Sequence, residues 1–353
     1  MSPLRIWLVG FGAVGQWLAR VLGTQAGQLA GSCGRELIVT GAGNARDGFV
    51  YNPGGLGLAS LLAAAAGGRA ITEQPGARVW PTAIEGLRAT EADLLLEVTA
   101  SPPADGEPGL THMREALQRG IPVATSNKWP VALHGVELAR LARRHGVGFR
   151  AESTVMSGTP VLSTLTEGLA GTVPVALRGL LNATANFILS EMAAGTSYVD
   201  ALAAAQRAGL AEPDPSADVE GGDAVAKIMV LSALVFGRQL GRDQVSCQGI
   251  TEVTSQQARE AVAAGGRLRH VATLAFAAPG GTGGVTARVR PEAVPAGDPL
   301  ASVDGVTNAL IMRADPVREV TIIGPGAGPD IAGQGVLSDL LAIAGQAGRT
   351  AIP

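Results

Sequence analysis

The chain has 353 residues and a formal net charge of −3 at pH 7, which excludes the strongly basic surface that nucleic-acid binding requires. Hydrophobic residues make up 46% of the sequence and charged residues 16%, a composition that argues against intrinsic disorder. The length suggests two domains, no apolar run reaches the roughly 18 residues of a membrane helix, and the two cysteines form neither a disulfide framework nor a metal-ligand spacing. We therefore expect a cytoplasmic globular protein without nucleic-acid or membrane partners.

The N-terminal segment predicts a strand, a glycine-rich turn and a helix. Apolar residues 6–9 precede the turn, a helical run at 16–22 follows it, and the turn itself consists of Gly10, Phe11, Gly12, Ala13, Val14 and Gly15. Glycines at the first, third and sixth positions allow a tight turn, close approach of a pyrophosphate, and packing of the helix on the strand. At the first strand–helix junction of a chain this pattern favours dinucleotide binding, with a glycine-rich turn of another α/β protein as the alternative.

The second predicted strand covers residues 36–40 and leads into a loop at residues 41–46. An acidic residue after this strand would favour NAD, but the loop contains Asn44 and Arg46 and no acid before Asp47. Arg46 could contact the 2′-phosphate of NADP, so we expect NADP as the cofactor and keep NAD as an alternative. A solvated arginine without any ligand is the competing interpretation.

Two further strands, at residues 93–98 and 121–125, end in polar residues. Helices predicted at 58–66 and 111–119 alternate with the strands, which indicates a parallel, doubly wound sheet. Thr99 and Ser101 follow one strand and Lys128 follows the other, at the carboxyl ends where open parallel sheets bind ligands. We expect a nicotinamide and its substrate to meet there.

Lysine is rare in this sequence. Lys128 and Lys227 are the two lysines among 27 basic residues. Guanidinium stays protonated, whereas a partly buried ammonium can change its pKa and transfer protons, so a chain that otherwise uses arginine should keep lysine where this property is needed. Chance survival of two lysines under a coding bias is the alternative.

The pattern changes near residue 150, where regular alternation of strands and helices ends. Strands are predicted at 149–155, 176–181, 284–290, 308–312 and 319–323, and helices at 160–169, 197–208, 222–236, 255–263 and 335–345. This pattern indicates a mixed or antiparallel sheet with helices on one face. We therefore expect a Rossmann-type dinucleotide-binding domain at residues 1–130, an α+β catalytic and dimerisation domain at 131–329, and a C-terminal helix at about 330–353 that returns to the first domain.

The densest motif lies at residues 209–227. Glu212 and Asp218 flank a turn with two prolines, and Asp223 and Lys227 lie one helical turn apart on the same face. The helix continues with apolar residues on nearly every side, so Lys227 should be at least partly buried and must be paired or neutral. A routine surface ion pair after an acidic helix start is the alternative, but it would not require this apolar setting.

From residue 6 to about residue 341 the chain resembles homoserine dehydrogenase, the enzyme that interconverts L-aspartate 4-semialdehyde and L-homoserine in threonine, methionine and isoleucine biosynthesis. The motifs that carry the resemblance are residues 10–15, 125–128, 152–155, 182–186 and 211–227. The last motif, with its order of acid, Asp-Pro, Asp-Val, Gly, Asp and Lys, is the most specific. The sequence resembles the short form of the family, which has neither a regulatory nor a kinase domain.

The resemblance implies roles for individual residues. Lys227 would be the general acid/base, Asp223 would orient it, and Lys128 would assist beside the nicotinamide. Glu212, Asp218 and Thr184 would bind the substrate, and Gly326 would contact the cofactor. Glu152, Val155, Ser157 and Thr159 would form a monovalent-cation site, usually for sodium. The family also suggests a homodimer formed through the sheet of the second domain.

Two positions depart from the family pattern near the substrate, where Ala183 replaces a common glycine and Leu210 a common tyrosine.

Two alternatives to the family's activity remain open. A semialdehyde dehydrogenase that forms an acyl phosphate needs a cysteine with a histidine partner, and neither Cys33 nor Cys247 is next to a histidine in the sequence. A nucleotide-binding sensor could keep the fold without catalysis, although the intact acids and lysines argue against it.

Overall fold

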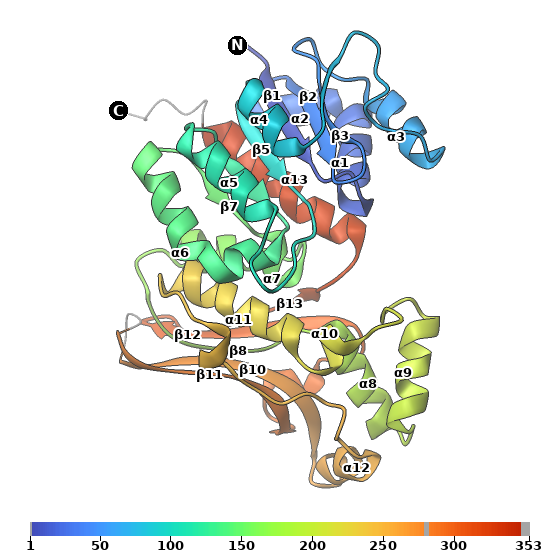
Figure 1. Ribbon diagram of the computed structural model, residues 1–353. Coiled ribbons are helices and arrows are strands. Elements are labelled where there is room, and N and C mark those ends of the chain that lie inside the picture. Colours follow the sequence, from blue (N-terminus) through green and yellow to red (C-terminus); the bar gives the residue numbers. More distant parts are fainter. Residues whose placement is uncertain (1, 279–281, 347–353) are drawn as a thin grey trace. The chain divides into compact units, whose positions relative to one another are not determined.

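The computed structural model describes residues 2–278 and 282–346, and it forms two compact units. The first contains the described residues up to Gly158 and those from Gly328 onward, and the second is Thr159–Ala327. Figure 1 shows the first unit in blue, green and red and the second in green, yellow and orange. Among the described residues no helix is both long and apolar enough to cross a membrane.

The first unit is built on a seven-stranded sheet of order β4-β3-β2-β1-β5-β6-β7. Its strands are β1 (Leu4–Val9), β2 (Leu37–Asn44), β3 (Gly48–Tyr51), β4 (Arg78–Trp80), β5 (Leu94–Glu97), β6 (Val123–Thr125) and β7 (Phe149–Arg150). The neighbouring strands β2, β1, β5, β6 and β7 pair in parallel. At one edge, β3 pairs antiparallel with β2, and β4 pairs antiparallel with β3. This is the doubly wound α/β architecture that the alternating pattern predicted.

Helices cover both faces of this sheet, which explains why its central strands β1 and β5 are mostly apolar and buried on both faces. The helices are α1 (Ala13–Thr24), α2 (Ala26–Cys33), α3 (Leu58–Ala66), α4 (Ala83–Ala89), α5 (Gly109–Gln118), α6 (Lys128–His145), α7 (Ser153–Met156) and α13 (Pro329–Gln346). Ile6 and Leu8 of β1 pack in the core that contains residues of α1 and α13, while Trp7 and Val9 pack in a separate core with α5 and α6. The alternation along one strand thus fills two layers.

The observed division of the chain differs from the predicted boundary after residue 130. Helix α6 packs against α5, and β7 pairs with β6, so the first unit extends to Gly158. At the other end, α13 packs on α1 and α2, although more than 300 residues separate it from α1 in the sequence (Figure 1). Within this unit the buried carboxylate of Asp339 accepts a hydrogen bond from the backbone N–H of Glu152 at 2.8 Å. Residues 347–353 of the predicted C-terminal helix lie outside the described residues.

The loop predicted at residues 41–46 is instead the end of a strand and a hairpin turn. Strand β2 continues to Asn44 and pairs with β3, because Gly41 and Gly43 leave room for the ring of Phe49. A Cβ at Gly41 would lie 2.5 Å from that ring, so these glycines serve cross-strand packing rather than a loop.

Two local predictions in the segment that follows α6 have different outcomes. The strand predicted at 149–155 is limited to Phe149–Arg150, and the short helix α7 (Ser153–Met156) follows it. The helix predicted at 160–169 is confirmed over residues 162–168, and its part at Thr164–Gly168 is π-helical. Contacts with distant residues help to replace the predicted strand by α7, since Ser153 Oγ in this helix donates to the carbonyl oxygen of Ala332 at 2.8 Å.

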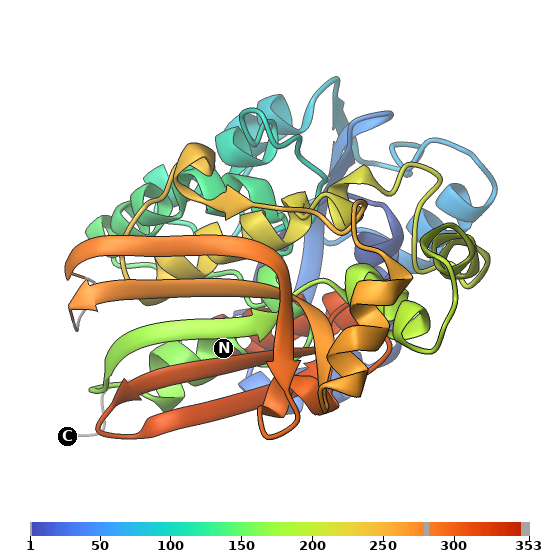
Figure 2. The same ribbon diagram turned by 90° about the horizontal axis from the view of Figure 1, so that it is seen from below.

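The second unit has a six-stranded sheet of order β13-β12-β8-β10-β11-β9. Its elements are β8 (Val173–Leu180), α8 (Ala183–Ala193), α9 (Tyr198–Arg207), α10 (Ser216–Val219), α11 (Gly222–Val235), β9 (Ser246–Cys247), α12 (Ser255–Ala263), β10 (Gly266–Ala278), β11 (Thr282–Pro295), β12 (Thr307–Asp315) and β13 (Arg318–Pro325). All pairs are antiparallel except β11 with β9, so the sheet is mixed, as predicted. Helix α11 packs against β10 and β11, while Figure 2 shows the opposite face of β8 and β10–β13 free of helices over most of its area.

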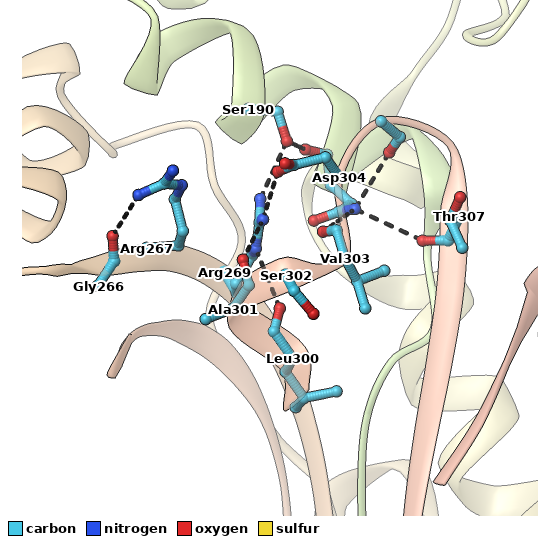
Figure 3. Close-up of polar contacts among 12 residues, drawn as sticks. Ser190, Gly266, Arg267, Arg269, Leu300, Ala301, Ser302, Val303, Asp304 and Thr307 are labelled. Atoms are coloured by element: carbon cyan, nitrogen blue, oxygen red, sulfur yellow. Dashed lines mark hydrogen bonds and ion pairs between the residues drawn. The ribbon is translucent and has the colours of Figure 1, made fainter. Parts of the chain in front are cut away.

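A buried arginine holds the connection between β11 and β12 (Figure 3). Arg269 of β10 is fully buried, and its guanidinium donates to the carbonyl oxygen of Ala301 at 3.0 Å, to Ser190 Oγ at 3.0 Å and to Asp304 Oδ1 at 2.5 Å. Asn186 adds hydrogen bonds from its Nδ2 to backbone carbonyl oxygens of the same connection. A buried guanidinium must satisfy its donors in this way, because an unpaired charge inside a protein is strongly destabilising.

Candidate active site

The glycine-rich turn lies between β1 and α1, as predicted. Gly10 has a φ of +105°, and a Cβ there would lie 2.5 Å from the backbone of Val98, while a Cβ at Gly15 would lie 2.0 Å from the Gly10 carbonyl oxygen. A Cβ at Gly12 would meet no atom within 4 Å. The first and third glycines therefore allow close packing within the protein, and the second leaves open space at the N-terminus of α1, where a pyrophosphate would fit. Phe11 is buried in the core, so it can offer a ligand its backbone only.

Arg46 lies in the hairpin turn after β2 and is ion-paired with Asp47. Its Nε lies 2.7 Å from Asp47 Oδ1, and its guanidinium also donates to the carbonyl oxygen of Arg69 at 3.1 Å. The hydrogen bond from Arg46 is the main reason that the pKa of Asp47 is lowered to about 2; burial opposes it, and a hydrogen bond from Asn44 assists it. Asn44, rather than an acid, is the last residue of β2.

Polar residues meet at the carboxyl ends of β5 and β6. Asn127 Nδ2 donates to Thr99 Oγ1 at 3.0 Å and to Ser101 Oγ at 2.8 Å. Thr99 in turn donates to the carboxylate of Glu97, which is fully buried and lies 3.5 Å from Nδ1 of His112. The structure thus brings together Thr99 and Ser101, as predicted, and Lys128 follows directly as the first residue of α6.

The sequence interpretation did not assign Glu97, Asn127 or His112 to this group. Asn127 directly precedes Lys128 in the motif at residues 125–128. Its position at the carboxyl end of a predicted strand is the signal that could have identified it. The fully buried Glu97 gave no such signal, because its strand is otherwise apolar and the contact with His112 joins residues 15 positions apart.

In the second unit, Lys227 and Asp223 lie on the buried helix α11. Lys227 is 7% exposed, and its Nζ lies 2.9 Å from Asp223 Oδ2 and donates to the carbonyl oxygen of Leu181 at 2.5 Å. The neighbouring residues Ala226, Ile228 and Met229 are fully buried. The prediction of a buried, paired lysine is confirmed.

Asp218 joins this group from α10. Asn182 Nδ2 donates to Asp218 Oδ1 at 2.6 Å and to Asp223 Oδ2 at 3.0 Å. Burial raises the pKa of Asp218 above its ordinary value and the Asp223 charge adds to this, while the hydrogen bonds from Asn182 and Thr184 and the charge of Lys227 oppose the shift. A carboxyl group of raised pKa beside a buried lysine is a feature common at functional sites.

Thr184 and Glu212, the other two residues expected to bind the substrate, have different environments. Thr184 is 5% exposed, and its hydroxyl donates to the carbonyl oxygen of Leu210 at 2.8 Å. This hydrogen bond fixes the loop that contains Leu210, the position at which the family commonly has tyrosine. Glu212 is exposed at the start of the proline turn, and its backbone carbonyl accepts a hydrogen bond from Gln206. The structure therefore groups Asp218 with Asp223 and Lys227, and it leaves Glu212 on the surface of the turn.

The residues proposed for a cation lie in one continuous segment. Glu152 and Val155 are buried, and Ser157 has a φ of +53°, a strained value for a residue other than glycine. In the described part of the chain, no three His, Cys, Asp or Glu side chains gather as metal ligands. A cation at this segment would therefore be held mainly by backbone and hydroxyl oxygens with Glu152 as the carboxylate. Thr159, the first residue of the second unit, donates instead to the carbonyl oxygen of Pro325 at 2.9 Å.

Gly326 lies against the side chain of Asn308 in the second unit. A Cβ at Gly326 would lie 2.1 Å from Asn308 Nδ2, so only glycine fits there. Asn308 is fully buried, and neither polar atom of its side chain has a hydrogen-bond partner among the described residues.

Neither cysteine is placed for nucleophilic catalysis. Cys33 is buried and donates to the carbonyl oxygen of Leu29 at 3.2 Å, while desolvation raises the pKa of the Cys247 thiol. Cys247 and His270 both lie next to Gly221, but the Nε2 of His270 is bonded to the carbonyl oxygen of Gln248, and burial lowers the pKa of this histidine. A thiol of raised pKa is a poor nucleophile, which argues against the acyl-phosphate alternative.

Comparison with known proteins assigns the chain to a family. The model of the homoserine dehydrogenase family matches residues 160–341. The NAD(+)-dependent homoserine dehydrogenase of Pseudomonas canavaninivorans is 36% identical over 343 residues, which cover 97% of this chain and 97% of the relative. The chain belongs to the homoserine dehydrogenase family. It is thus a member of a family of NAD(P)-dependent oxidoreductases, and the resemblance found in its motifs is confirmed.

Other family members agree over nearly the whole chain. The homoserine dehydrogenase of Methanocaldococcus jannaschii is 32% identical over 339 residues, which cover 96% of this chain and 98% of the relative. A homoserine dehydrogenase structure from Thiobacillus denitrificans has a TM-score of 0.82 at 31% identity and covers 99% of this chain and 74% of that chain. A hyperthermophilic archaeal homoserine dehydrogenase in complex with NADPH has a TM-score of 0.81 at 28% identity, with 97% of each chain covered.

Proposed function

We propose that this protein is an NAD(P)-dependent homoserine dehydrogenase that interconverts L-aspartate 4-semialdehyde and L-homoserine. The observation that carries the proposal is the buried Lys227, whose ammonium is held between Asp223 and the carbonyl oxygen of Leu181. An ammonium in this setting can donate a proton to an oxygen that gains negative charge and can take it back in the reverse direction.

The first unit is proposed as the dinucleotide-binding domain. When bound, the nicotinamide supplies the hydride that reduces the aldehyde carbon, or accepts it from the alcohol. Open space over Gly12 and the start of α1 suit the pyrophosphate. The backbone of residues 10–15, with Asn44 and Arg46 for the ribose and Thr99, Ser101, Lys128 and Gly326 for the nicotinamide side, is the proposed cofactor-binding set.

The second unit is proposed as the catalytic and dimerisation domain. Lys227 donates the proton that turns the developing alkoxide into the hydroxyl of homoserine, and Asp223 holds the ammonium of Lys227 in place. Asp218 and Glu212 bind the α-ammonium of the substrate, and Thr184 positions the loop that carries Leu210. Lys128 assists beside the nicotinamide.

An assay of NADPH and NADH oxidation with aspartate semialdehyde tests this proposal. Turnover that requires the semialdehyde, and the reverse reaction with homoserine, are expected. Tight binding of the nucleotide without turnover of either substrate would instead support the sensor alternative.

We propose NADP as the preferred cofactor, with NAD also accepted. The support is that β2 ends in Asn44 instead of an acid, with Arg46 two residues later. Because Arg46 is paired with Asp47, it must exchange this partner for a 2′-phosphate. Specificity constants for NADPH and NADH in wild type and Arg46→Ala decide the matter, since a ratio unchanged by the substitution would remove Arg46 from the cofactor site.

We also propose that Glu152, Val155, Ser157 and Thr159 hold a monovalent cation, sodium by family likeness. The strained Ser157 backbone and the single buried carboxylate of Glu152 suit a site made mainly of oxygen atoms from the backbone. Thermal unfolding of dialysed protein should shift upward with sodium, and the shift should be lost in Glu152→Gln.

A homodimer through the sheet of the second unit is proposed from the character of its open face. Thr321 and Arg313 of its strands are exposed, and Ile323 is 53% exposed. Light scattering, compared between wild type and Ile323→Glu, tests this arrangement.

A cytoplasmic location and a role in amino-acid biosynthesis are proposed from the class of substrate and cofactor alone.

A further inference from the structure

Asn182 connects the two carboxylates of the lysine site. It follows β8 as the N-cap residue of α8, and its Oδ1 accepts the backbone N–H of Ala185 at 2.8 Å. A cap position requires an oxygen, so the amide nitrogen must point the other way, toward Asp218 at 2.6 Å and Asp223 at 3.0 Å. The side chain is 6% exposed, which shields these contacts from water.

The contacts of Asn182 continue to the lysine. Asp223 Oδ2, which accepts from Asn182, is also 2.9 Å from Lys227 Nζ, and Lys227 donates to the carbonyl oxygen of Leu181, the residue before Asn182. Residues 181 and 182 therefore fix both ends of the Asp223–Lys227 pair. Asn182 also supplies two N–H donors between two carboxylates that would otherwise repel each other.

The choice of asparagine is informative, because the two other α-helices of this unit that have a side-chain cap, α9 and α12, use hydroxyl residues. Ser197 caps α9 and Thr254 caps α12, each through its side-chain oxygen. Serine, threonine and aspartate would cap α8 as well as asparagine does, but none of them provides an uncharged NH₂ group to two acids.

We propose that Asn182 is a positioning residue that keeps Asp218 and Asp223 ionised and aligned with Lys227. Its effect on turnover rests on the proposed function, whereas its effect on the carboxylates does not.

Few other charges act on this group. Asp223 and Lys227 of α11 are the charged residues with the largest influence on Asp218, while Glu191 of α8 is half-buried and Glu220 at the end of α10 is exposed. On the strand packed against α8 and α11, Arg269 is bound to Asp304, and His270 is bonded to the carbonyl oxygen of Gln248. The charged residues of the adjoining helices α9 and α12 are exposed: Asp200, Arg207, Arg259 and Glu260. A change at Asn182 should therefore be reported directly by Asp218.

Asn182→Ser tests the proposal, because serine keeps the cap and loses the amide. The probe is the carboxyl carbon of Asp218 in the full chain labelled with ¹³C-aspartate and assigned with Asp218→Asn. Without the donor, the pKa of Asp218 should rise by about one unit. An unchanged titration would overturn the proposal. Ser197→Ala removes a cap oxygen on α9 and should leave the titration of Asp218 unchanged. If the serine variant does not fold, Asn182→Asp keeps both cap and size and should raise the pKa further.

Kinetics then test the link to catalysis. In Asn182→Ser the acid limb of the kcat/KM profile for homoserine should move to higher pH by the same amount, with the KM for NADP unchanged. A wild type without turnover would refute the proposed function, while the titration would still decide the role of Asn182. An active wild type whose pH profile is the same in the variant would show that Asn182 does not position the site for reaction.

Discussion

The Nζ of Lys227 lies 2.9 Å from Oδ2 of Asp223, one turn earlier on a helix that is buried over most of its length. An exposed pair at this spacing would stabilise a helix by about 0.3–0.5 kcal/mol. Here the lysine is 7% exposed, and removal of one partner would leave an uncompensated buried charge. The buried setting therefore distinguishes this pair from a routine surface ion pair, and its proposed role in proton transfer leads to the first prediction.

Lys227→Arg should abolish most of the turnover. Arginine keeps the positive charge, but its guanidinium does not deprotonate near neutral pH and is larger than the ammonium. We expect kcat to fall by at least roughly 100-fold, the contribution typical of a general acid/base, with little change in the dissociation constant of the cofactor. Steady-state kinetics in both directions and a fluorescence titration with NADPH measure these quantities. Turnover above about a tenth of wild type would contradict the role of Lys227 as the proton donor.

Asp47→Asn should make stability less dependent on pH at the acid end. The pKa of Asp47 is lowered to about 2, chiefly by the hydrogen bond from Arg46, so its ionised form stabilises the folded state. That contribution is fully present above the unfolded pKa near 3.8 and is lost as the pH falls through about 2. The difference in free energy of unfolding between wild type and variant should thus be largest above about pH 5 and should shrink steadily as the pH falls toward and through about 2. Urea unfolding across this range tests the expectation, and a difference that stays constant would refute it.

Arg269→Met should destabilise the second unit by about 3 kcal/mol. The fully buried guanidinium donates hydrogen bonds to Ser190 Oγ and to the carbonyl oxygens of Leu300 and Ala301. Methionine has no donor, so these oxygens would lose the hydrogen bonds from residue 269. Arg267→Met is a matched control on the same strand, because Arg267 donates to the adjacent carbonyl of Gly266 (Figure 3). Chemical denaturation should separate the two variants clearly, and equal midpoints would show that the Arg269 contacts contribute no net stability.

Local patterns were sufficient to predict several parts of the site. The turn at Gly10–Gly15 depends on glycine spacing after an apolar strand, and the helix predicted at 222–236 is found at Gly222–Val235. The burial of Lys227 followed from apolar neighbours on every side of that helix. Each of these features is determined by residues that are close in the sequence.

Features that depend on distant partners could not be predicted in this way. Gly41 and Gly43 suggested a loop because their reason, the ring of Phe49, comes from another strand. Strand β10 (Gly266–Ala278) was missed because its first half contains polar residues such as Arg269, whose partners lie more than 30 residues away. The contacts of Asn182 could not be predicted for the same reason, since Asp218 and Asp223 lie 36 and 41 residues further along the chain.

Glu212→Gln tests how the substrate ammonium is recognised. Aspartate semialdehyde and homoserine both carry this group, and a carboxylate that binds it forms a charge-assisted hydrogen bond worth about 1.5–3 kcal/mol. Glu212 is exposed at the proline turn, whereas Asp218 is already bonded to Asn182, so Glu212 has more freedom to take the ammonium. We expect the KM for homoserine to rise roughly tenfold or more, with the KM for NADP and the melting temperature nearly unchanged.

Asp214→Asn is the matched control for this prediction. Asp214 is an exposed acid of the same turn, and it accepts a hydrogen bond from the backbone N–H of Ser216 at 3.1 Å, a contact that asparagine can keep. If Glu212 binds the ammonium, loss of charge at residue 214 should leave the KM for homoserine unchanged while loss at residue 212 raises it. An equal rise in both variants would indicate general attraction of a cation by an acidic turn. A rise in both KM values together with a lower melting temperature in Glu212→Gln would show that Glu212 only shapes the turn, and substrate recognition would then rest on Asp218.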